Sequence, residues 1–330
     1  MSTEKTSRPA ATAVAHPNIA LVKYWGKRDD ELILPVAGSM SMTLDAFATT
    51  TTVELLEEGA ATDSFILNDA PASGKPLERT VAFLDHVRAL AGSERRAAVT
   101  SVNEAPTGAG LASSASGFAA LALAASTAYG LELDERALSR LARRGSGSAS
   151  RSIIDRYAVW HAGTDDESSF AEEIEAPDLR LVIVTVDARE KAVSSREAMR
   201  LTAQTSPFYE AWIGSTEASL EEMTRACAAG DATRIGEITE SHALRMHAVI
   251  SSTEPPVRYL APGSVAVFDV AVRLREQGVP VYGTADAGPN VCLLTTPEHA
   301  DQVAAAVEGL GEVRVVGPGP GARLLDEQGA

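Results

Sequence analysis

The hydrophobic and polar residues at the start of the chain follow the two-residue period of β-strands. Residues 12–69 contain three such runs, ATAVAHPNIALVKYW, SMSMTLDAFATTTTVELLEE and SFILND. The spacing of apolar residues changes to that of a helix at about 76–90, where a proline occupies the first turn, and AAVTSVN (97–103) returns to a strand pattern. Residues 1–11 show neither period and are predicted to form a loose tail.

The rest of the chain mixes helices and strands without strict alternation. Helices are expected at about 113–129 and 134–144, the second with Asp134 as its N-cap and Gly145 at its end. The β-branched run LRLVIVTVD (179–187) predicts a buried strand. Beyond it, the pattern predicts helices that begin at Ser206-Pro207 and at Asp231, a helix at 264–276, two short strands near 280–295, a helix from Pro297 and a strand at 313–316. This mixture predicts an α+β fold with a domain boundary near residue 187.

Composition and charge limit the classes of protein to consider. The 330 residues are 45% hydrophobic and 22% charged, which is typical of a globular protein with one large or two medium domains. The formal net charge of −16 argues against a nucleic-acid or anionic-membrane partner, because both require broad basic surfaces. The N-terminus lacks the apolar stretch of a signal peptide, and the most apolar window, 118–128, is too short to span a bilayer. We therefore expect a cytoplasmic protein.

Several common catalytic and metal-binding motifs are missing from the sequence. Cys227 and Cys292 lie far apart without a CxxC spacing, so neither a disulfide framework nor a zinc cluster is predicted. There is no GxxxxGK[ST], GxSxG or HExxH motif. His242 and His247 are five residues apart, on different faces of a helix, and are predicted to be packed or solvated rather than metal ligands. The C-terminal GPGPGA (317–322) is interrupted by prolines and is predicted to be a loop.

The stretch PTGAGLASSASG (106–117) places glycines and small residues directly before an alanine-rich helix. Gly108 and Gly110 leave the backbone open to a ligand, and a helix N-terminus offers N–H groups and a partial positive charge. Ser113 and Ser114 add hydroxyl groups that can bind phosphate oxygens or Mg²⁺. This combination is typical of a phosphate site, and the alternative is a turn followed by a tightly packed helix.

Separated stretches of the chain resemble the motifs of one enzyme family. HPNIALVKYWGKRD (16–29), the 106–117 stretch and TADAGPNV (284–291) together resemble the GHMP superfamily of small-molecule kinases, and within it the diphosphomevalonate decarboxylase family. The likeness covers nearly the whole chain after the tail, because it continues through RRGSGSASRS (143–152), VSSREAM (193–199) and ALRMHA (243–248).

The resemblance implies a fold, a reaction and cofactors. The implied fold has an N-terminal domain of the ribosomal-protein-S5 type (12–187), a C-terminal ferredoxin-like domain (188–330) and an active site between them. In the implied reaction, ATP with Mg²⁺ phosphorylates the tertiary 3-hydroxyl of mevalonate 5-diphosphate, phosphate leaves, and the carboxylate is lost as CO₂ to give isopentenyl diphosphate. Family members are commonly homodimers, so a homodimer is implied as well.

The family pattern assigns these roles to residues of this sequence. A tertiary hydroxyl needs a positioned carboxylate, and Asp286 matches the family's catalytic aspartate. A guanidinium holds the substrate carboxylate best, and Arg151 matches that residue, with Lys27 as a third catalytic candidate. The positions that match substrate contacts are Tyr24, Trp25, Lys27, Ser146, Ser148, Arg151, Ser195 and Arg196. ATP is expected at Pro106, Gly108, Gly110, Leu111, Ala112, Ser113 and Ser114, with Ser113 or Ser114 as a candidate Mg²⁺ ligand. The alternatives are a turn-forming aspartate, solvated surface groups and, for Tyr24 and Trp25, ordinary core aromatics.

One segment departs from the family pattern. Typical members continue after the arginine with an aromatic residue and two glycines, whereas this chain has Asp155 and Arg156 at the glycine positions. The two charges either pair at the surface or crowd Arg151 and reshape the substrate pocket. Other functions therefore stay open: a relative acting on mevalonate 5-phosphate or another 3-hydroxy acid, a kinase that stops at phosphorylation, or a nucleotide-binding regulator without catalysis.

Overall fold

Three β-sheets organise residues 9–104, 113–189 and 192–325, which are the residues that the computed structural model describes. The first sheet has the order β16-β1-β6-β9-β7-β8 and consists of β1 Ala10–Ala15, β6 Thr49–Leu55, β7 Ser64–Leu67, β8 Ala70–Pro71, β9 Ala97–Asn103 and β16 Arg323–Leu324. The second has the order β11-β10-β5-β2 and consists of β2 Asn18–Val22, β5 Ser39–Thr43, β10 Tyr157–Trp160 and β11 Ala171–Glu173. The third has the order β13-β14-β12-β15 and consists of β12 Arg180–Thr185, β13 Val281–Thr284, β14 Val291–Thr295 and β15 Glu312–Val316.

Helices cover these sheets, and a short ribbon of β3 Lys27–Asp29 and β4 Leu34–Pro35 completes the strands. The α-helices are α1 Lys75–Ala91, α2 Ser113–Ala128, α3 Glu135–Gly145, α4 Ser195–Thr205, α5 Tyr209–Ala228, α6 Ala232–Ser251, α7 Pro262–Glu276 and α8 Ala300–Ala306. The 3₁₀ segments are η1 Gly147–Ile153 and η2 Pro297–His299. Strands and helices are thus mixed along the whole described chain, which confirms the predicted α+β class.

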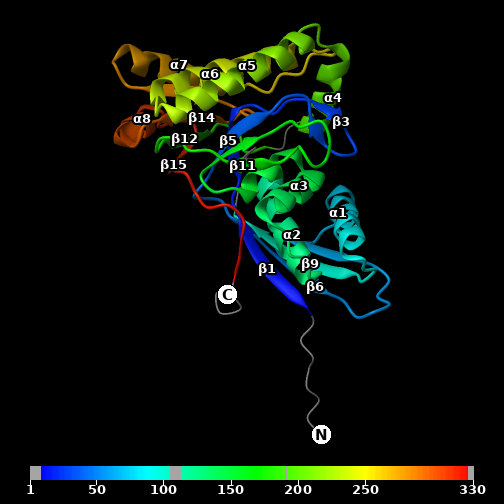
Figure 1. The fold of residues 1–330 in the computed structure, drawn as a ribbon. Helices are drawn as coiled ribbons and strands as arrows, with labels where there is room; N and C mark the ends of the chain where they lie inside the picture. The colour runs from blue at the N-terminus through cyan, green and yellow to red at the C-terminus, as the bar shows by residue number, and fades with distance from the viewer. Residues whose placement is uncertain (1–8, 105–112, 190–191, 326–330) are drawn as a thin grey trace.

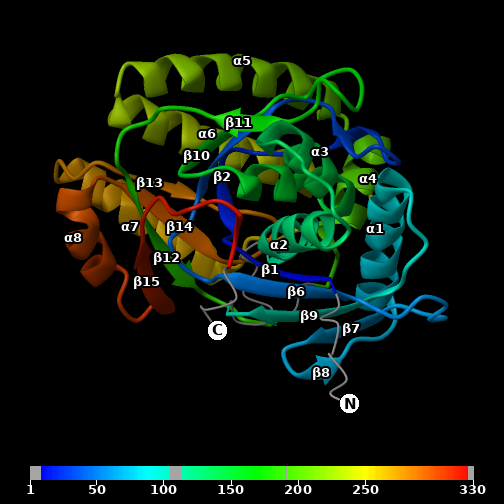
Figure 2. The same ribbon diagram turned by 60° about the horizontal axis from the view of Figure 1, so that its bottom comes forward.

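The helices gather in two groups, one at each end of the molecule (Figure 1). The helices α1 and α2 lie with the first sheet, where Figure 2 shows α2 next to β1 and β6, and α3 packs on α2 and on β11 of the second sheet. Because α2 consists mainly of alanine, leucine and serine, it packs closely on the sheet and eleven of its residues are buried. The helices α5, α6 and α7 form a layer at the other end, beside the third sheet.

One hydrophobic core joins elements from distant parts of the sequence. Leu21 of β2 and Met42 of β5 pack in the same cluster as Leu181 of β12, Ile235 of α6 and Leu294 of β14. All five side chains are at most 4% exposed. This shared core brings the end of β2 close to the turn between β13 and β14, and the candidate active site lies there.

The structure confirms most predicted elements and corrects some of them. The helix with Asp134 as N-cap is present, since its carboxylate accepts the N–H of Ala137, and Asp231 caps α6 in the same way through Arg234. The first strand begins at Ala10, inside the predicted tail. Sequence reasoning missed the helix α4 and several short elements, namely β3, β4, β8, η1, β10, β11 and β16. The GPGPGA segment is a loop, as predicted.

Candidate active site

A buried ion pair joins the two motifs that lie furthest apart in the sequence. Lys23 directly follows β2, and Asp286 lies in the turn between β13 and β14. The Lys23 Nζ is 2.6 Å from Asp286 Oδ1, and the lysine side chain is 1% exposed whereas that of the aspartate is 28% exposed. The ammonium group is therefore buried, whereas the carboxylate is partly exposed and accessible to a ligand.

Arg151 lies at the centre of a set of neutral hydrogen-bond acceptors. Its Nε donates to Ser41 Oγ at 3.0 Å, its Nη1 to Ser39 Oγ at 2.8 Å and its Nη2 to Asn18 Oδ1 at 3.1 Å. The residue is 2% exposed. Burial lowers the pKa of its guanidinium to about 10, and the nearby Asp286 carboxylate opposes that effect, so Arg151 remains charged at neutral pH.

A buried cation with only neutral direct partners is poised for an anion. A guanidinium has five N–H donors, and three of those on Arg151 are engaged as described above. One N–H on each Nη has no partner among the described residues, and such a pair can hold a carboxylate bidentately. The serines and Asn18 fix the orientation of the guanidinium plane. The burial of Arg151 contradicts the alternative of a solvated arginine, and its carboxylate-holding role stays a prediction.

The two predicted aromatic contacts have different environments. The Tyr24 ring meets the Trp160 ring edge-on at 4.9 Å, and its buried hydroxyl has no hydrogen-bond partner among the described residues. Burial raises the pKa of Tyr24, against the influence of Arg151 and Arg196. Trp25 is 3% exposed within a hydrophobic cluster, and its Nε1 donates to Thr202 Oγ1 at 3.1 Å. The core alternative therefore describes Trp25 well, whereas substrate contact by Tyr24, whose ring also packs against the core, stays a prediction.

Serine hydroxyls from two segments meet at the start of α2. Ser113 and Ser114 are exposed in its first turn, and Ser114 Oγ lies 3.3 Å from Ser146 Oγ, which in turn lies 3.4 Å from Ser148 Oγ. These hydroxyl groups can donate hydrogen bonds to a phosphate group. The N-terminus of α2, which is a long helix, can add backbone N–H donors beside them. The other residues assigned to ATP, which are Pro106, Gly108, Gly110, Leu111 and Ala112, lie outside the described residues.

The remaining predicted contacts come from β3 and from the first turn of α4. Lys27 Nζ forms an ion pair with Asp30 at 2.8 Å, and the Asp30 side chain is 82% exposed. Ser195 is half-buried and Arg196 is exposed, both in the first turn of α4. The prediction that Lys27 acts in catalysis stays a prediction, since its direct partner is the surface carboxylate of Asp30.

The structure supports neither of the two alternatives for the Asp155-Arg156 departure. Both side chains are exposed, and the Asp155 carboxylate accepts the N–H of Gly321 at 2.6 Å instead of pairing with its neighbour. The backbone N–H of Arg156 donates to the Gly319 carbonyl at 2.8 Å. The C-terminal loop therefore accommodates the two residues, and the guanidinium of Arg151 contacts neither of them.

Other sequence expectations concern metals, thiols and membranes. Among the described residues, no three His, Cys, Asp or Glu side chains group as they would around a metal ion. Both cysteines are buried and free. His242 and His247 are packed rather than solvated, at 0% and 6% exposure. None of the described helices combines the length and the apolar character needed to cross a membrane.

Sequence reasoning missed two groups at the centre of the site. Lys23 and Asn18 were part of the quoted HPNIALVKYWGKRD motif but were given no role. A signal was available for Lys23, because it interrupts an apolar run whose neighbours in β2 are all buried. Asn18 gave no such signal: its Nδ2 donates to Ser148 O and Ser152 Oγ and its Oδ1 accepts from Arg151, contacts that depend on η1 folding over β2.

The mixed α+β fold, in which an aspartate from the second half of the chain meets a lysine from the first, defines a protein of the GHMP-kinase type. Family models agree with this class. The diphosphomevalonate decarboxylase-like N-terminal domain matches residues 15–171, and the mevalonate 5-diphosphate decarboxylase C-terminal domain matches residues 181–313. The chain belongs to the diphosphomevalonate decarboxylase family.

Individual relatives cover almost the whole chain. The phosphomevalonate decarboxylase of Haloferax volcanii is 36% identical over 97% of this chain and 99% of its own length. The diphosphomevalonate decarboxylase of Homo sapiens is 36% identical over 90% of this chain and 80% of its own length. A solved structure described as MDDEF in complex with MVAPP, AMPPCP and magnesium is 42% identical, with a TM-score of 0.92 over 97% of this chain and all of that one.

Proposed function

We propose that this protein catalyses the ATP-dependent decarboxylation of mevalonate 5-diphosphate to isopentenyl diphosphate, CO₂, ADP and phosphate, a step of the mevalonate pathway of isoprenoid biosynthesis. The observation that carries the proposal is the meeting of two charged groups with different roles. Asp286 offers a partly exposed carboxylate, and Arg151 is a fully desolvated guanidinium within its electrostatic influence. A kinase alone would need only the first of these groups.

Asp286 is the group that handles the proton of the 3-hydroxyl. As the hydroxyl oxygen attacks the γ-phosphorus of ATP, the bond from that phosphorus to the β-phosphate oxygen breaks and the hydroxyl proton passes to the carboxylate. The Lys23 ammonium lies 2.6 Å from Asp286 Oδ1 and holds the carboxylate in place. Lys23 therefore acts as a positioning residue, and Asp286 as the catalytic one.

Arg151 orients the substrate carboxylate for the second step. The phosphorylated oxygen leaves as inorganic phosphate with its bonding electrons, the bond between the carboxylate and the substrate chain breaks, and its electron pair forms the new double bond as CO₂ departs. Ser39, Ser41 and Asn18 hold the guanidinium plane while its remaining N–H pair binds the carboxylate. Holding the carboxylate in one plane favours the orientation in which the breaking bonds align.

The phosphates of both substrates meet hydroxyl and N–H donors more than cations. Ser113, Ser114, Ser146 and Ser148 supply the hydroxyl groups near the start of α2. Mg²⁺ would neutralise charge between the β- and γ-phosphates of ATP. Because the described residues contain no cluster of metal-binding side chains, its ligands would come mainly from phosphate oxygens and water, with a serine hydroxyl as the protein contribution.

A second substrate deserves the same assay, namely mevalonate 5-phosphate. The relative from Haloferax volcanii, which matches over nearly its full length, carries the name phosphomevalonate decarboxylase. In addition, Lys27, one of the cations assigned to the diphosphate, is engaged by Asp30. We keep the diphosphate as the proposed substrate because Arg196 and the serine hydroxyls near the start of α2 provide further donors for its phosphate groups.

The same proposal includes the setting in which the protein works. We propose a cytoplasmic homodimer whose chain divides into a tail (1–11), an ATP-binding domain (12–187) and a C-terminal domain (188–330). The limits of the two matched family domains, 15–171 and 181–313, support a boundary in this region.

A parallel assay of ADP and CO₂ tests the proposal. The enzyme is incubated with Mg-ATP and, in separate reactions, mevalonate 5-diphosphate, mevalonate 5-phosphate or mevalonate. We expect equal amounts of ADP and CO₂ with the diphosphate. ADP without CO₂ would make the protein a kinase, equal products with the monophosphate alone would change the substrate, and no turnover with any of them would contradict an enzymatic role.

A further inference from the structure

The helix α6 places one buried histidine against each partner of the Lys23–Asp286 ion pair. His242 contacts the backbone of Lys23, and His247 contacts the backbone next to Asp286. Their separation of five positions in the sequence corresponds to about 7.5 Å along the helix axis. Neither histidine has a role in the reaction described above, and neither matches a predicted contact.

His242 fixes the backbone of Lys23. Its Nδ1 accepts the Lys23 N–H at 3.0 Å, and its Nε2 therefore carries the proton and donates to Thr216 Oγ1 at 3.2 Å. The ring also packs against the indole of Trp212, with ring centroids 4.6 Å apart. Burial lowers the pKa of His242 to about 3, and Arg245 and Lys23 add to the effect, so the ring is neutral and can accept this hydrogen bond.

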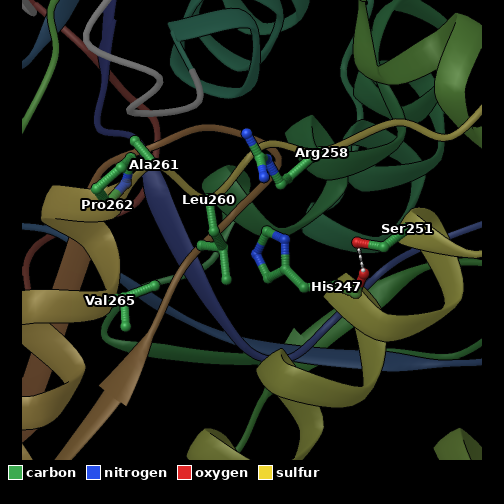
Figure 3. A pocket seen from close by; sticks show the side chains of 7 residues that line it. All are labelled: His247, Ser251, Arg258, Leu260, Ala261, Pro262 and Val265. Atoms are coloured by element: carbon green, nitrogen blue, oxygen red, sulfur yellow. Dashed lines mark hydrogen bonds between the residues drawn. The ribbon is translucent and has the colours of Figure 1, made fainter.

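His247 fixes the other partner. Its Nε2 lies 3.2 Å from the carbonyl oxygen of Ala285, the residue before Asp286, and must be protonated because a carbonyl only accepts. Burial lowers the pKa of His247 to about 4, with Lys23 acting in the same direction and Asp286 against it. Figure 3 shows the ring beside Leu260 and below Arg258, where it lines a cavity of about 270 Å³ at the start of α7.

Each histidine therefore presents a different nitrogen to the site. The Nδ1 of His242 must act as a hydrogen-bond acceptor, whereas the Nε2 of His247 must act as a donor. A lysine and an aspartate that follow strands of different sheets must approach within hydrogen-bonding distance, and small displacements of either would weaken the pair. One rigid helix that holds both backbones reduces the freedom of the two segments to move apart.

We propose that His242 and His247 are positioning residues for catalysis, and that α6 uses their hydrogen bonds to Lys23 N and Ala285 O to hold the Lys23–Asp286 pair in its reactive arrangement. The inference rests on the proposed function, because it assigns a role within that reaction. It concerns the orientation of Asp286 rather than substrate binding. The expected signature is therefore a lower kcat at nearly unchanged KM for ATP and for the mevalonate substrate.

Amide substitutions test the two contacts one nitrogen at a time. The Asn side-chain oxygen occupies the position of His Nδ1, and the Gln side-chain NH₂ occupies that of Nε2. His242→Asn and His247→Gln therefore keep the functional contact and should retain kcat. The exchanged amides, His242→Gln and His247→Asn, lose it while remaining polar and of similar size, and we expect kcat to fall about 10- to 100-fold. His242→Leu and His247→Leu should show at least the same loss.

A matched control lies on the same helix. Thr239 is fully buried, and its hydroxyl has no partner among the described residues. Thr239→Val should keep the wild-type kcat, which separates the histidine contacts from a general loosening of α6. Melting temperatures of all variants show which of them fold, and the comparison of matching with exchanged amides does not depend on the leucine variants.

The outcomes separate this inference from the proposed function. Wild-type protein without ADP and CO₂ formation would refute the proposed function and the inference with it. An active wild type with folded exchanged-amide variants at wild-type kcat would refute the inference alone. Equal loss in the matching and exchanged amides, or a loss confined to KM, would also refute it, because the two specific hydrogen bonds would then not be the cause.

Discussion

The Asp155-Arg156 departure should affect stability and leave catalysis unchanged. Asp155 accepts the Gly321 N–H through its exposed carboxylate. Arg156 has a φ of 51°, in the left-handed region, where a residue with a Cβ is strained. The informative substitutions are therefore Asp155→Ala, which removes one hydrogen bond, and Arg156→Gly, which restores the residue type that tolerates this backbone.

The two substitutions should change the free energy of unfolding in opposite directions. A left-handed conformation costs a residue other than glycine about 1 to 2 kcal/mol. Glycine loses more conformational entropy on folding, which offsets about 0.5 to 1 kcal/mol of the stability gained by relieving that strain. Arg156→Gly should thus stabilise the protein by about 0.5 to 1 kcal/mol. Asp155→Ala should destabilise it by about 1 kcal/mol, because one exposed hydrogen bond from the Gly321 N–H is lost.

Urea unfolding and steady-state kinetics on the same samples check both statements. The unfolding midpoint should rise for Arg156→Gly and fall for Asp155→Ala. The ratio of kcat/KM for mevalonate 5-diphosphate to that for mevalonate 5-phosphate should not change in either variant, since neither side chain reaches the Arg151 guanidinium. A changed ratio would refute this reasoning and restore the alternative in which the two charges reshape the substrate pocket.

Further predictions concern the charged centre and the buried histidines. Asp286→Ala should abolish ADP formation, and Arg151→Gln should reduce CO₂ release, both measured in the parallel assay; near-wild-type activity of Asp286→Ala would show that this carboxylate is not the base. Burial lowers the pKa of His242 to about 3 and that of His247 to about 4 from an ordinary value of 6.5. Because the unfolded chain binds the extra protons below pH 6.5, stability is present above that pH and is lost as the pH falls, by about 2 kcal/mol for each histidine between pH 7 and pH 5. Urea unfolding across this range should therefore show a smaller loss for the double variant His242→Asn/His247→Gln, and equal losses would contradict it.

The sequence was most informative where structure is local. The helix α3 follows from its cap at Asp134 and its apolar period, and β12 from its β-branched run, so both were predicted within one or two residues. The short strands β10 and β11 were missed, because a strand of three or four residues leaves too few positions to show a period. The strand β10 pairs with β5, which lies more than a hundred residues earlier in the sequence, and β11 pairs with β10.

The site shows the same division between local and distant causes. The family pattern identified Asp286 and Arg151 because each sits in a short, recognisable motif. It did not reveal that Lys23 pairs with Asp286, since the two residues are 263 positions apart and meet only when β2 and the β13–β14 turn share one core. The environment of Asp155 could not be predicted from the sequence either, because its carboxylate contacts the distant C-terminal loop.

The buried cations explain how an acidic protein can serve polyanionic substrates. A net charge of −16 opposes the approach of ATP and of a mevalonate phosphate, and exposed cations would be screened by salt and by neighbouring carboxylates. Lys23 and Arg151 are sealed from water, where screening is weak and each charge acts strongly over a short distance. Lys23 is committed to Asp286, whereas Arg151 has no direct anionic partner among the described residues. The fold thus keeps one desolvated positive charge for the substrate carboxylate, and it can do so only because neutral side chains of β2 and β5 accept hydrogen bonds from three N–H groups of the guanidinium.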